Sequence, residues 1–205
     1  MKLGVYGGSF DPIHNGHLIF AQQMIDEGGL DKILFVPAQK QYMKADHKAS
    51  FIDRCNMVNL AIDGNPRFEL EVIHDDLDTY TYNTLVELKK RYPNDDLFFI
   101  AGTDIVDSLE KWHKVGELGK YCTMMIGERE LDDNRESDLQ TTRVLAKLDE
   151  IYRKYDLPSV TVWNLIGLSV SSTLIRRKIR ESYSTAYLTP KSVIDYIYSR
   201  DLYKE

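Results

Sequence analysis

The chain has few cysteines and no long apolar run, and both features limit the class of protein to which it can belong. Cys55 and Cys122 are the only cysteines in 205 residues, and they lie far apart in apolar stretches. They are most simply reduced core thiols rather than a disulfide or a metal site. No apolar run approaches the ~20 residues of a membrane-spanning helix, so no contact with a membrane is expected. The first strand is expected at residue 2 or 3, without a signal peptide before it, which favours a cytoplasmic location.

The chain also lacks an excess of basic residues. Lys and Arg number 26 against 32 Asp and Glu, which gives a formal net charge of −6. This balance argues against a nucleic-acid partner but leaves room for one small basic pocket that takes a nucleotide. The composition is 43% hydrophobic and 28% charged, without repeats, low-complexity tracts or linkers, as in an ordinary globular protein. We therefore predict a single domain over residues 1–205.

The most informative stretch is GGSFDPIHNGHL, over residues 7–18. A short apolar strand precedes it, and apolar residues recur at helical spacing from Leu18 onward. The stretch is therefore a strand-to-helix turn, in which two glycines allow the backbone to bend and to approach a ligand. Backbone amides at a helix start attract anions. His14 and His17 lie at the mouth of this predicted phosphate site, so the stretch indicates chemistry on phosphate.

Short apolar runs alternate with amphipathic stretches along the whole chain. Strands are predicted at about 2–7, 32–36, 68–72, 97–101, 122–126 and 160–163, with helices between them. This alternation predicts a Rossmann-like α/β fold, a doubly wound and mostly parallel sheet of about six strands. In such sheets ligands bind beyond the carboxyl ends of the strands, where the strand order reverses.

Helix boundaries are predicted from capping residues and apolar spacing. A helix over residues 51–62 is expected to bury Phe51, Ile52 and Cys55. Thr81 is a candidate N-cap for the helix that follows the third strand. Residues 128–139 are predicted to form a charged surface loop, and Pro190 is expected in the first turn of the last helix.

Two later stretches carry further polar groups to strand ends. Ser171, Ser172 and Thr173 offer hydroxyls and amides at a helix start, and Arg176 lies one turn further on. They form either a second anion site, suited to the β- and γ-phosphates, or a plain N-cap beside a solvated basic face. After the fourth strand, Gly102 permits close approach of a ligand, and Asp104 could accept a hydrogen bond from a ribose hydroxyl.

The pattern HxGH is that of the nucleotidyltransferase superfamily, and the fuller string resembles the bacterial nicotinate-nucleotide adenylyltransferases. Three later stretches resemble that family in the same order: YTYNTL at 80–85, GTD at 102–104 continuing to KWH at 111–113, and SVSSTLIR at 169–176. Two positions depart from it. Thr103 stands where the family usually has alanine, and QYMK at 41–44 stands where it usually has Pro-Pro-His-Lys.

The resemblance implies adenylyl transfer from ATP to nicotinate mononucleotide, which yields deamido-NAD and pyrophosphate in NAD biosynthesis. It implies Mg²⁺ bound together with ATP, but neither a tightly bound cofactor nor a metal site in the protein. Alternatives are another small nucleotidyltransferase, with nicotinamide mononucleotide, phosphopantetheine or glycerol phosphate as acceptor, and a non-catalytic nucleotide-binding module. A class I aminoacyl-tRNA synthetase fragment is disfavoured, because the chain is short and acidic. The oligomeric state, including a homo-oligomer, stays open.

The resemblance also implies roles for individual residues. His17 is expected to contact the α-phosphate and His14 the neighbouring phosphates, with Arg176 as a third catalytic residue. The residues expected to bind ATP are Gly8, Ser9, Phe10, His14, Gly16, His17, Gly102, Asp104, Ser171, Ser172, Thr173 and Arg176. Those expected to bind the acceptor are Lys44, Tyr80, Thr81, Thr84 and Trp112, with Lys48 as the alternative to Lys44.

Overall fold

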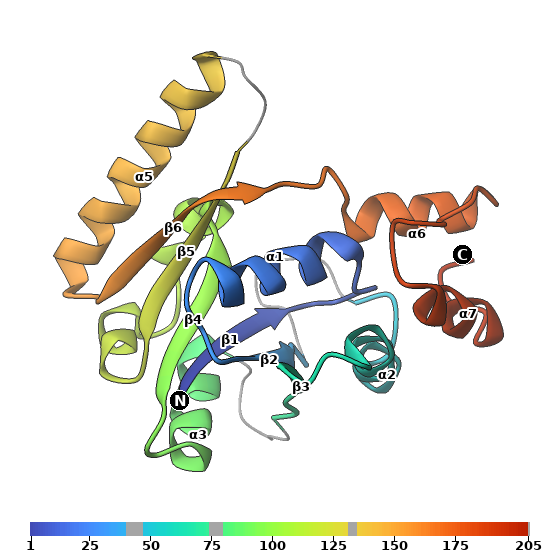
Figure 1. Cartoon of the computed structure of the whole chain (residues 1–205), viewed down its shortest axis with the longest axis horizontal. Coiled ribbons are helices and arrows are strands. Elements are labelled where there is room, and N and C mark those ends of the chain that lie inside the picture. Colours follow the sequence, from blue (N-terminus) through green and yellow to red (C-terminus); the bar gives the residue numbers. More distant parts are fainter. Residues whose placement is uncertain (40–46, 74–79, 131–134, 205) are drawn as a thin grey trace.

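A six-stranded parallel sheet forms the centre of the molecule (Figure 1). The computed structural model describes residues 1–39, 47–73, 80–130 and 135–204. The strands are β1 (Lys2–Gly8), β2 (Lys32–Pro37), β3 (Phe68–Leu70), β4 (Asp96–Gly102), β5 (Thr123–Glu130) and β6 (Ser159–Ile166). Their order is β3-β2-β1-β4-β5-β6, and every neighbouring pair is parallel. The predicted Rossmann-like doubly wound sheet is confirmed.

Helices cover both faces of the sheet. The longer ones are α1 (Asn15–Asp26), α2 (Phe51–Ile62), α3 (Thr81–Arg91), α5 (Arg135–Tyr155), α6 (Ser172–Arg180) and α7 (Lys191–Ser199). Shorter helical turns are η1 (Thr103–Ile105), α4 (Val106–Leu109) and η2 (Val115–Lys120). Buried residues of α1, α2, α6 and α7 share one core cluster, and those of α3, α4 and α5 share another.

Successive residues of β1 point into different cores, as the period of two requires. Val5 belongs to the cluster with α3 and α5, whereas Tyr6 belongs to the cluster with α1 and α2. The strand order reverses between β1 and β4, because the chain runs outward through β2 and β3 before it returns to the other side of β1. The carboxyl ends of β1 and β4 therefore flank the switch point at which such sheets bind ligands.

The prediction of a charged loop over 128–139 is wrong at both ends. Strand β5 continues to Glu130, where it pairs with β6, and α5 has already begun at Arg135. Charged residues suggested a loop, but backbone pairing between neighbouring strands determines the structure here. Strand β6 is likewise longer than predicted, whereas β3 ends at Leu70 rather than Val72.

Two predicted helix starts are displaced by one residue. Tyr80, not Thr81, is the N-cap of α3, and Thr81 is its first helical residue. Pro190 is the N-cap of α7 rather than its first residue, because its ψ of 146° is still extended. At α6 the N-cap is Ser171, whose hydroxyl oxygen accepts a hydrogen bond from the Leu174 amide at 3.2 Å.

Neither cysteine forms a disulfide, as predicted. Cys122 is buried, which raises the pKa of its thiol to about 12, whereas Cys55 in α2 is only half-buried. Within the described parts of the chain, none of the helices combines the length and the apolar character that crossing a bilayer requires.

Candidate active site

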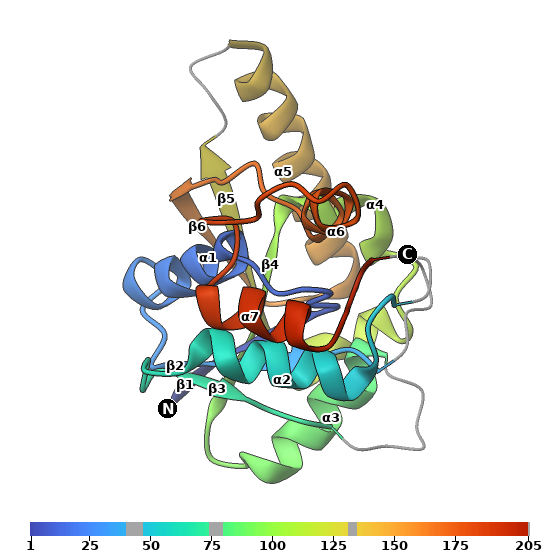
Figure 2. The same ribbon diagram turned by 90° about the vertical axis from the view of Figure 1, so that its right-hand side faces the viewer.

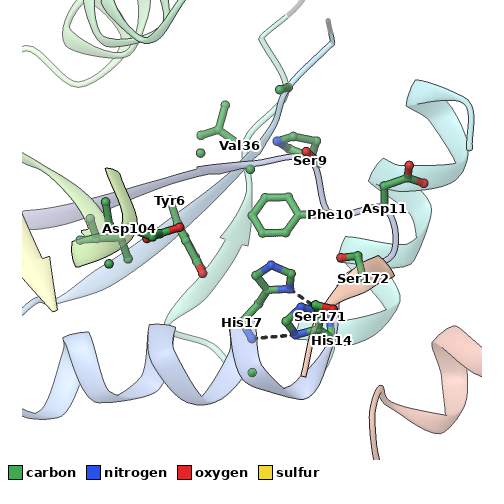
Figure 3. A pocket seen from close by; sticks show the side chains of 18 of the residues that line it. Tyr6, Ser9, Phe10, Asp11, His14, His17, Val36, Asp104, Ser171 and Ser172 are labelled. Atoms are coloured by element: carbon green, nitrogen blue, oxygen red, sulfur yellow. Dashed lines mark hydrogen bonds between the residues drawn. The ribbon is translucent and has the colours of Figure 1, made fainter. Parts of the chain in front are cut away.

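A cavity of about 730 Å³ opens at the carboxyl ends of β1, β2 and β4 (Figure 3). Segments from opposite ends of the chain meet there, as the sequence predicted. The lining includes every residue expected to bind ATP: Gly8, Ser9, Phe10, His14, Gly16, His17, Gly102, Asp104, Ser171, Ser172, Thr173 and Arg176. The three motifs therefore converge on one site, although the convergence alone does not assign their roles.

His14 and His17 cap the start of α1 reciprocally. The Nδ1 atom of His14 accepts from the His17 amide at 3.3 Å, and Nδ1 of His17 accepts from the His14 amide at 3.2 Å. The two rings stack with centroids 3.6 Å apart and planes inclined by 21°. Because each Nδ1 is an acceptor, the ring proton of each neutral imidazole is on Nε2. The pair therefore brings two Nε2–H donors to one end of the cavity (Figure 3).

The side chain of Phe10 packs against the ring of His17. Phe10 is 1% exposed, and its ring lies edge-on to His17 at 5.1 Å between centroids. A Cβ atom on Gly8 would lie 2.9 Å from the Phe10 ring, so only glycine fits beside this phenylalanine. The sequence suggested only backbone contacts from Phe10 and conformational freedom at Gly8. The structure shows in addition that Gly8 and Phe10 pack against each other.

Helix α6 is hydrogen-bonded directly to the loop that follows β1. The Ser172 hydroxyl donates to the Pro12 carbonyl at 2.8 Å, and Nη1 of Arg176 donates to the Asp11 carbonyl at 2.7 Å. A further Arg176 nitrogen donates to the Thr173 hydroxyl oxygen at 3.3 Å. The Ser172 hydroxyl thus donates within the protein, whereas the hydroxyls of Ser171 and Thr173 accept in these bonds and keep their own O–H groups. What α6 presents to a ligand includes these O–H groups, the amides of its first turn and the remaining N–H groups of Arg176.

Asp104 and Trp112 line the side of the cavity that β4 provides. Asp104 lies in η1 and is exposed, across the view of Figure 3 from Ser171 and Ser172. The Trp112 ring packs edge-on against Phe99 at 5.5 Å between centroids and stays half-buried. Trp112 is therefore both a core contact and a wall of the cavity.

The residues expected to bind the acceptor are only partly brought together. Thr81 and Thr84, in the first turn of α3, line the cavity. Tyr80 is not part of the lining and stacks on His113 at 4.7 Å between ring centroids. Lys44 lies outside the described residues, whereas the alternative residue, Lys48, lines the cavity.

Arg54 of α2 was not identified from the sequence. It is fully buried and donates to the Ser9 carbonyl at 2.7 Å and to the Ala38 carbonyl at 2.6 Å, and burial lowers the pKa of its guanidinium. It thereby joins the loops that follow β1 and β2. The helical spacing could have indicated its burial, because Arg54 lies one turn before the buried Val58 on the same face of α2. Ile52, predicted on the buried face, is instead 71% exposed.

The side chain of Asp11 also holds the loop that follows β1. Its carboxylate is 4% exposed and accepts from the amides of Lys48 at 2.7 Å and Ala49 at 3.1 Å. The loop after β1 is therefore fixed on three sides, by α6, by Arg54 and by the segment that precedes α2.

Comparison with known proteins agrees with this geometry. A family model described as cytidylyltransferase-like matches residues 5–178. The chain is 36% identical over 207 residues to the nicotinate-nucleotide adenylyltransferase of Bacillus subtilis, covering 99% of this chain and 98% of that protein. A probable nicotinate-nucleotide adenylyltransferase of Bacillus pumilus is 36% identical over 206 residues, with coverage of 99% and 98%.

A solved structure extends the similarity to the fold. The Plasmodium falciparum nicotinic acid mononucleotide adenylyltransferase complexed with NaAD has a TM-score of 0.74 and 23% identity, and the match covers 98% of this chain and 97% of that one. The chain belongs to the cytidylyltransferase-like family and, within it, to the nicotinate-nucleotide adenylyltransferases.

Proposed function

We propose that the protein transfers the adenylyl group of ATP to nicotinate mononucleotide, forming deamido-NAD and pyrophosphate. The observation that carries this proposal is the direct attachment of α6 to the histidine loop. The bonds from Ser172 to Pro12 and from Arg176 to Asp11 unite two anion-binding helix starts in one cavity. Such a site suits a polyphosphate, whose charge is spread over neighbouring groups.

The reaction needs donors and correct positioning rather than a side-chain nucleophile. An oxygen of the acceptor's phosphate forms a bond to the α-phosphorus of ATP, while the bond from that phosphorus to the oxygen bridging to the β-phosphate breaks. The attacking oxygen is already ionised near pH 7, so no proton has to be removed from it. Catalysis then comes from holding two polyanions together and stabilising the charge that develops.

The donors of the cavity fit these tasks. The Nε2–H group of His17 is assigned to the α-phosphate and that of His14 to a neighbouring phosphate. The first-turn amides of α6 and the free N–H groups of Arg176 are assigned to the departing pyrophosphate. Asp104 is assigned to a ribose hydroxyl of the nucleotide.

The acceptor is assigned to the other side of the cavity. Trp112 is assigned to stack on the pyridine ring, because it lines the cavity and packs edge-on against Phe99. The first-turn amides of α3, beside Thr81 and Thr84, are assigned to the nicotinate carboxylate. Lys44 or Lys48 is assigned to the acceptor's phosphate.

Mg²⁺ is proposed to enter the site together with ATP. Among the described residues there is no group of three or more His, Cys, Asp and Glu side chains that could hold a metal ion. The donor set of the cavity is instead composed of imidazoles, amides and an arginine, which bind phosphate oxygens. A phosphate-bound Mg²⁺ would neutralise part of the charge on the polyphosphate.

The test is a pyrophosphate-release assay with ATP, Mg²⁺ and a small panel of acceptors: nicotinate mononucleotide, nicotinamide mononucleotide, phosphopantetheine and glycerol phosphate. The expected result is fastest release with nicotinate mononucleotide, and deamido-NAD as the product identified by mass. CTP in place of ATP is the control for the nucleotide. Release that is fastest with phosphopantetheine or glycerol phosphate, or with CTP, would overturn the proposal, and so would ATP binding without turnover on any acceptor.

A further inference from the structure

The last residues of the described chain reach back to the loop that carries the histidines. Tyr203, beyond α7, donates a hydrogen bond from its hydroxyl to Oδ1 of Asp11 at 2.7 Å. It lies outside residues 5–178, the part matched by the family model. We propose that Tyr203 is a positioning residue for adenylyl transfer, which acts through Asp11 on both halves of the active site. This inference rests on the proposed function.

Asp11 is the point at which four segments of the chain meet. Its Oδ2 atom accepts from the Lys48 amide, and its Oδ1 atom accepts from both the Ala49 amide and Tyr203. Its backbone carbonyl accepts from Arg176 of α6. In Figure 3 the Asp11 carboxylate points away from the two histidines and toward α2. Asp11 lines the cavity, and it connects the proposed phosphate donors with Lys48 through its backbone carbonyl and its carboxylate.

The hydroxyl of Tyr203 donates to the Asp11 carboxylate from a side chain, whereas Lys48 and Ala49 donate from their backbone amides. Asp11 is 4% exposed and Tyr203 is 9% exposed, so little water reaches the bond between them. Burial and the neighbouring Asp11 carboxylate raise the pKa of Tyr203, so the hydroxyl stays protonated and donates at physiological pH. Without that hydroxyl, the bond that Oδ1 of this buried carboxylate would keep, among the described residues, is that from the Ala49 amide, at 3.1 Å. A buried carboxylate with incomplete hydrogen bonding moves to a new position or takes up a water molecule as a partner.

The same C-terminal segment contains a matched control. Tyr196 of α7 donates to Oδ1 of Asp53 at 2.8 Å and accepts from Asn56 at 2.9 Å. Helices α7 and α2 lie side by side in Figures 1 and 2, so this second tyrosine–aspartate bond joins two helices. Tyr196, Asp53 and Asn56 are not among the residues that line the cavity. Tyr196 and Tyr203 therefore make the same kind of hydrogen bond, from a tyrosine hydroxyl to an aspartate. The bond of Tyr203 reaches the loop that carries the histidines, whereas that of Tyr196 reaches α2.

The experiment compares Tyr203→Phe with Tyr196→Phe, each of which removes one hydroxyl and keeps the ring. Thermal unfolding, kcat, and KM for ATP and for nicotinate mononucleotide are measured for both variants and for the unmodified protein. Both variants should lose a similar, small amount of thermal stability. Only Tyr203→Phe should lower kcat/KM, by about tenfold, with a raised KM for the acceptor, because displaced positioning groups cost rate. Kinetics for Tyr203→Phe within twofold of those for Tyr196→Phe would overturn the inference.

A second measurement needs neither substrate. Hydrogen exchange of the Lys48 and Ala49 amides, followed by NMR, should be faster in Tyr203→Phe than in Tyr196→Phe, because these amides are anchored on Asp11. Equal exchange in the two variants would also overturn the inference. Failure of the proposed function appears separately, as an unmodified protein that does not turn over ATP with nicotinate mononucleotide.

Discussion

Three helices begin at the cavity, and they differ in how their first amides are satisfied. At α1 the two histidines cap each other's backbone, and at α6 the Ser171 hydroxyl accepts from Leu174. At α3 the N-cap is Tyr80, which makes no side-chain capping bond within the described part of the chain. The amides of the first turn have no partner inside a helix. Within the described residues, α3 therefore differs from the other two helices in that the N-cap side chain makes no capping bond.

The two sides of the site differ in the contacts that the described residues make. The side assigned to ATP is held by side-chain caps and by direct bonds between α6 and the histidine loop. The side assigned to the acceptor offers backbone donors on α3 and the wall formed by Trp112. Changes on the ATP side should therefore impair turnover or ATP binding strongly, whereas changes on the acceptor side should alter acceptor binding and selectivity.

The largest expected effect comes from the histidine pair. His17→Ala removes the donor assigned to the α-phosphate, so kcat should fall by roughly 10²–10³, the usual loss for one positioned donor. Binding of ATP, measured by titration, should stay within about tenfold. His17→Asn is the control, since its amide oxygen can still accept from His14 while the imidazole donor is lost. A kcat within a few-fold of the unmodified protein would remove His17 from this role.

Arg176→Ala should act on ATP binding more than on turnover. Its loss removes a charged hydrogen-bonding group, typically about 1.5–3 kcal/mol, or roughly a 10- to 100-fold rise in KM for ATP. KM is measured at saturating acceptor. Arg177→Ala is the matched control, because Arg177 is the next residue of α6 and is exposed. An unchanged KM for ATP in Arg176→Ala would contradict the assignment.

On the acceptor side, we expect a preference for nicotinate over nicotinamide mononucleotide of at least tenfold in kcat/KM. The positive end of a helix contributes up to ~2 kcal/mol when partly buried, and ~1.4 kcal/mol corresponds to a factor of ten. The first-turn amides of α3 would add charge-assisted bonds to the carboxylate. Thr79, Asp75, Asp76 and Asp78, which precede this helix, lie outside the described residues. A ratio near one would overturn the acceptor assignment and leave adenylyl transfer intact.

The smallest expected effect separates two lysines. Lys44→Ala should raise KM for the acceptor more than Lys48→Ala does, because Lys44 aligns better with the family's lysine. The difference is expected to be a few-fold, since an exposed charge contributes little. Lys48 lines the cavity, so the reverse order would assign the acceptor's phosphate to Lys48 instead.

What could be predicted from the sequence was mostly local. The histidines are three residues apart, and Ser172 and Arg176 are separated by one helical turn. The bond from Tyr203 to Asp11 spans 192 residues, and that from Arg54 to Ser9 spans 45, so no short pattern contains either pair. Both bonds follow from how helices pack on the sheet. The alternation of strands and helices predicted the sheet itself, but not its order.

The wrong predictions for α2 and β5 also arise because contacts between segments distant in the sequence override local patterns. Ile52 is apolar but faces solvent. Arg54 is charged but buried, because the carbonyls of Ser9 and Ala38 accept hydrogen bonds from its two terminal nitrogens. Hydrophobicity alone assigns both to the wrong face of α2. Local propensity similarly placed the charged residues of β5 in a loop, where pairing with β6 decides otherwise.

The reciprocal cap of His14 and His17 has a consequence for how this site can change over evolutionary time. Each ring accepts a hydrogen bond from its partner's backbone amide and also lines the cavity. Replacing one histidine therefore also leaves the other without its stacking neighbour and exposes an amide at the helix start. The two substitutions are coupled rather than additive, as expected for residues that act as a unit. A lineage that altered this pair stepwise would pass through an intermediate impaired in both capping and chemistry, which favours keeping both histidines or losing them together.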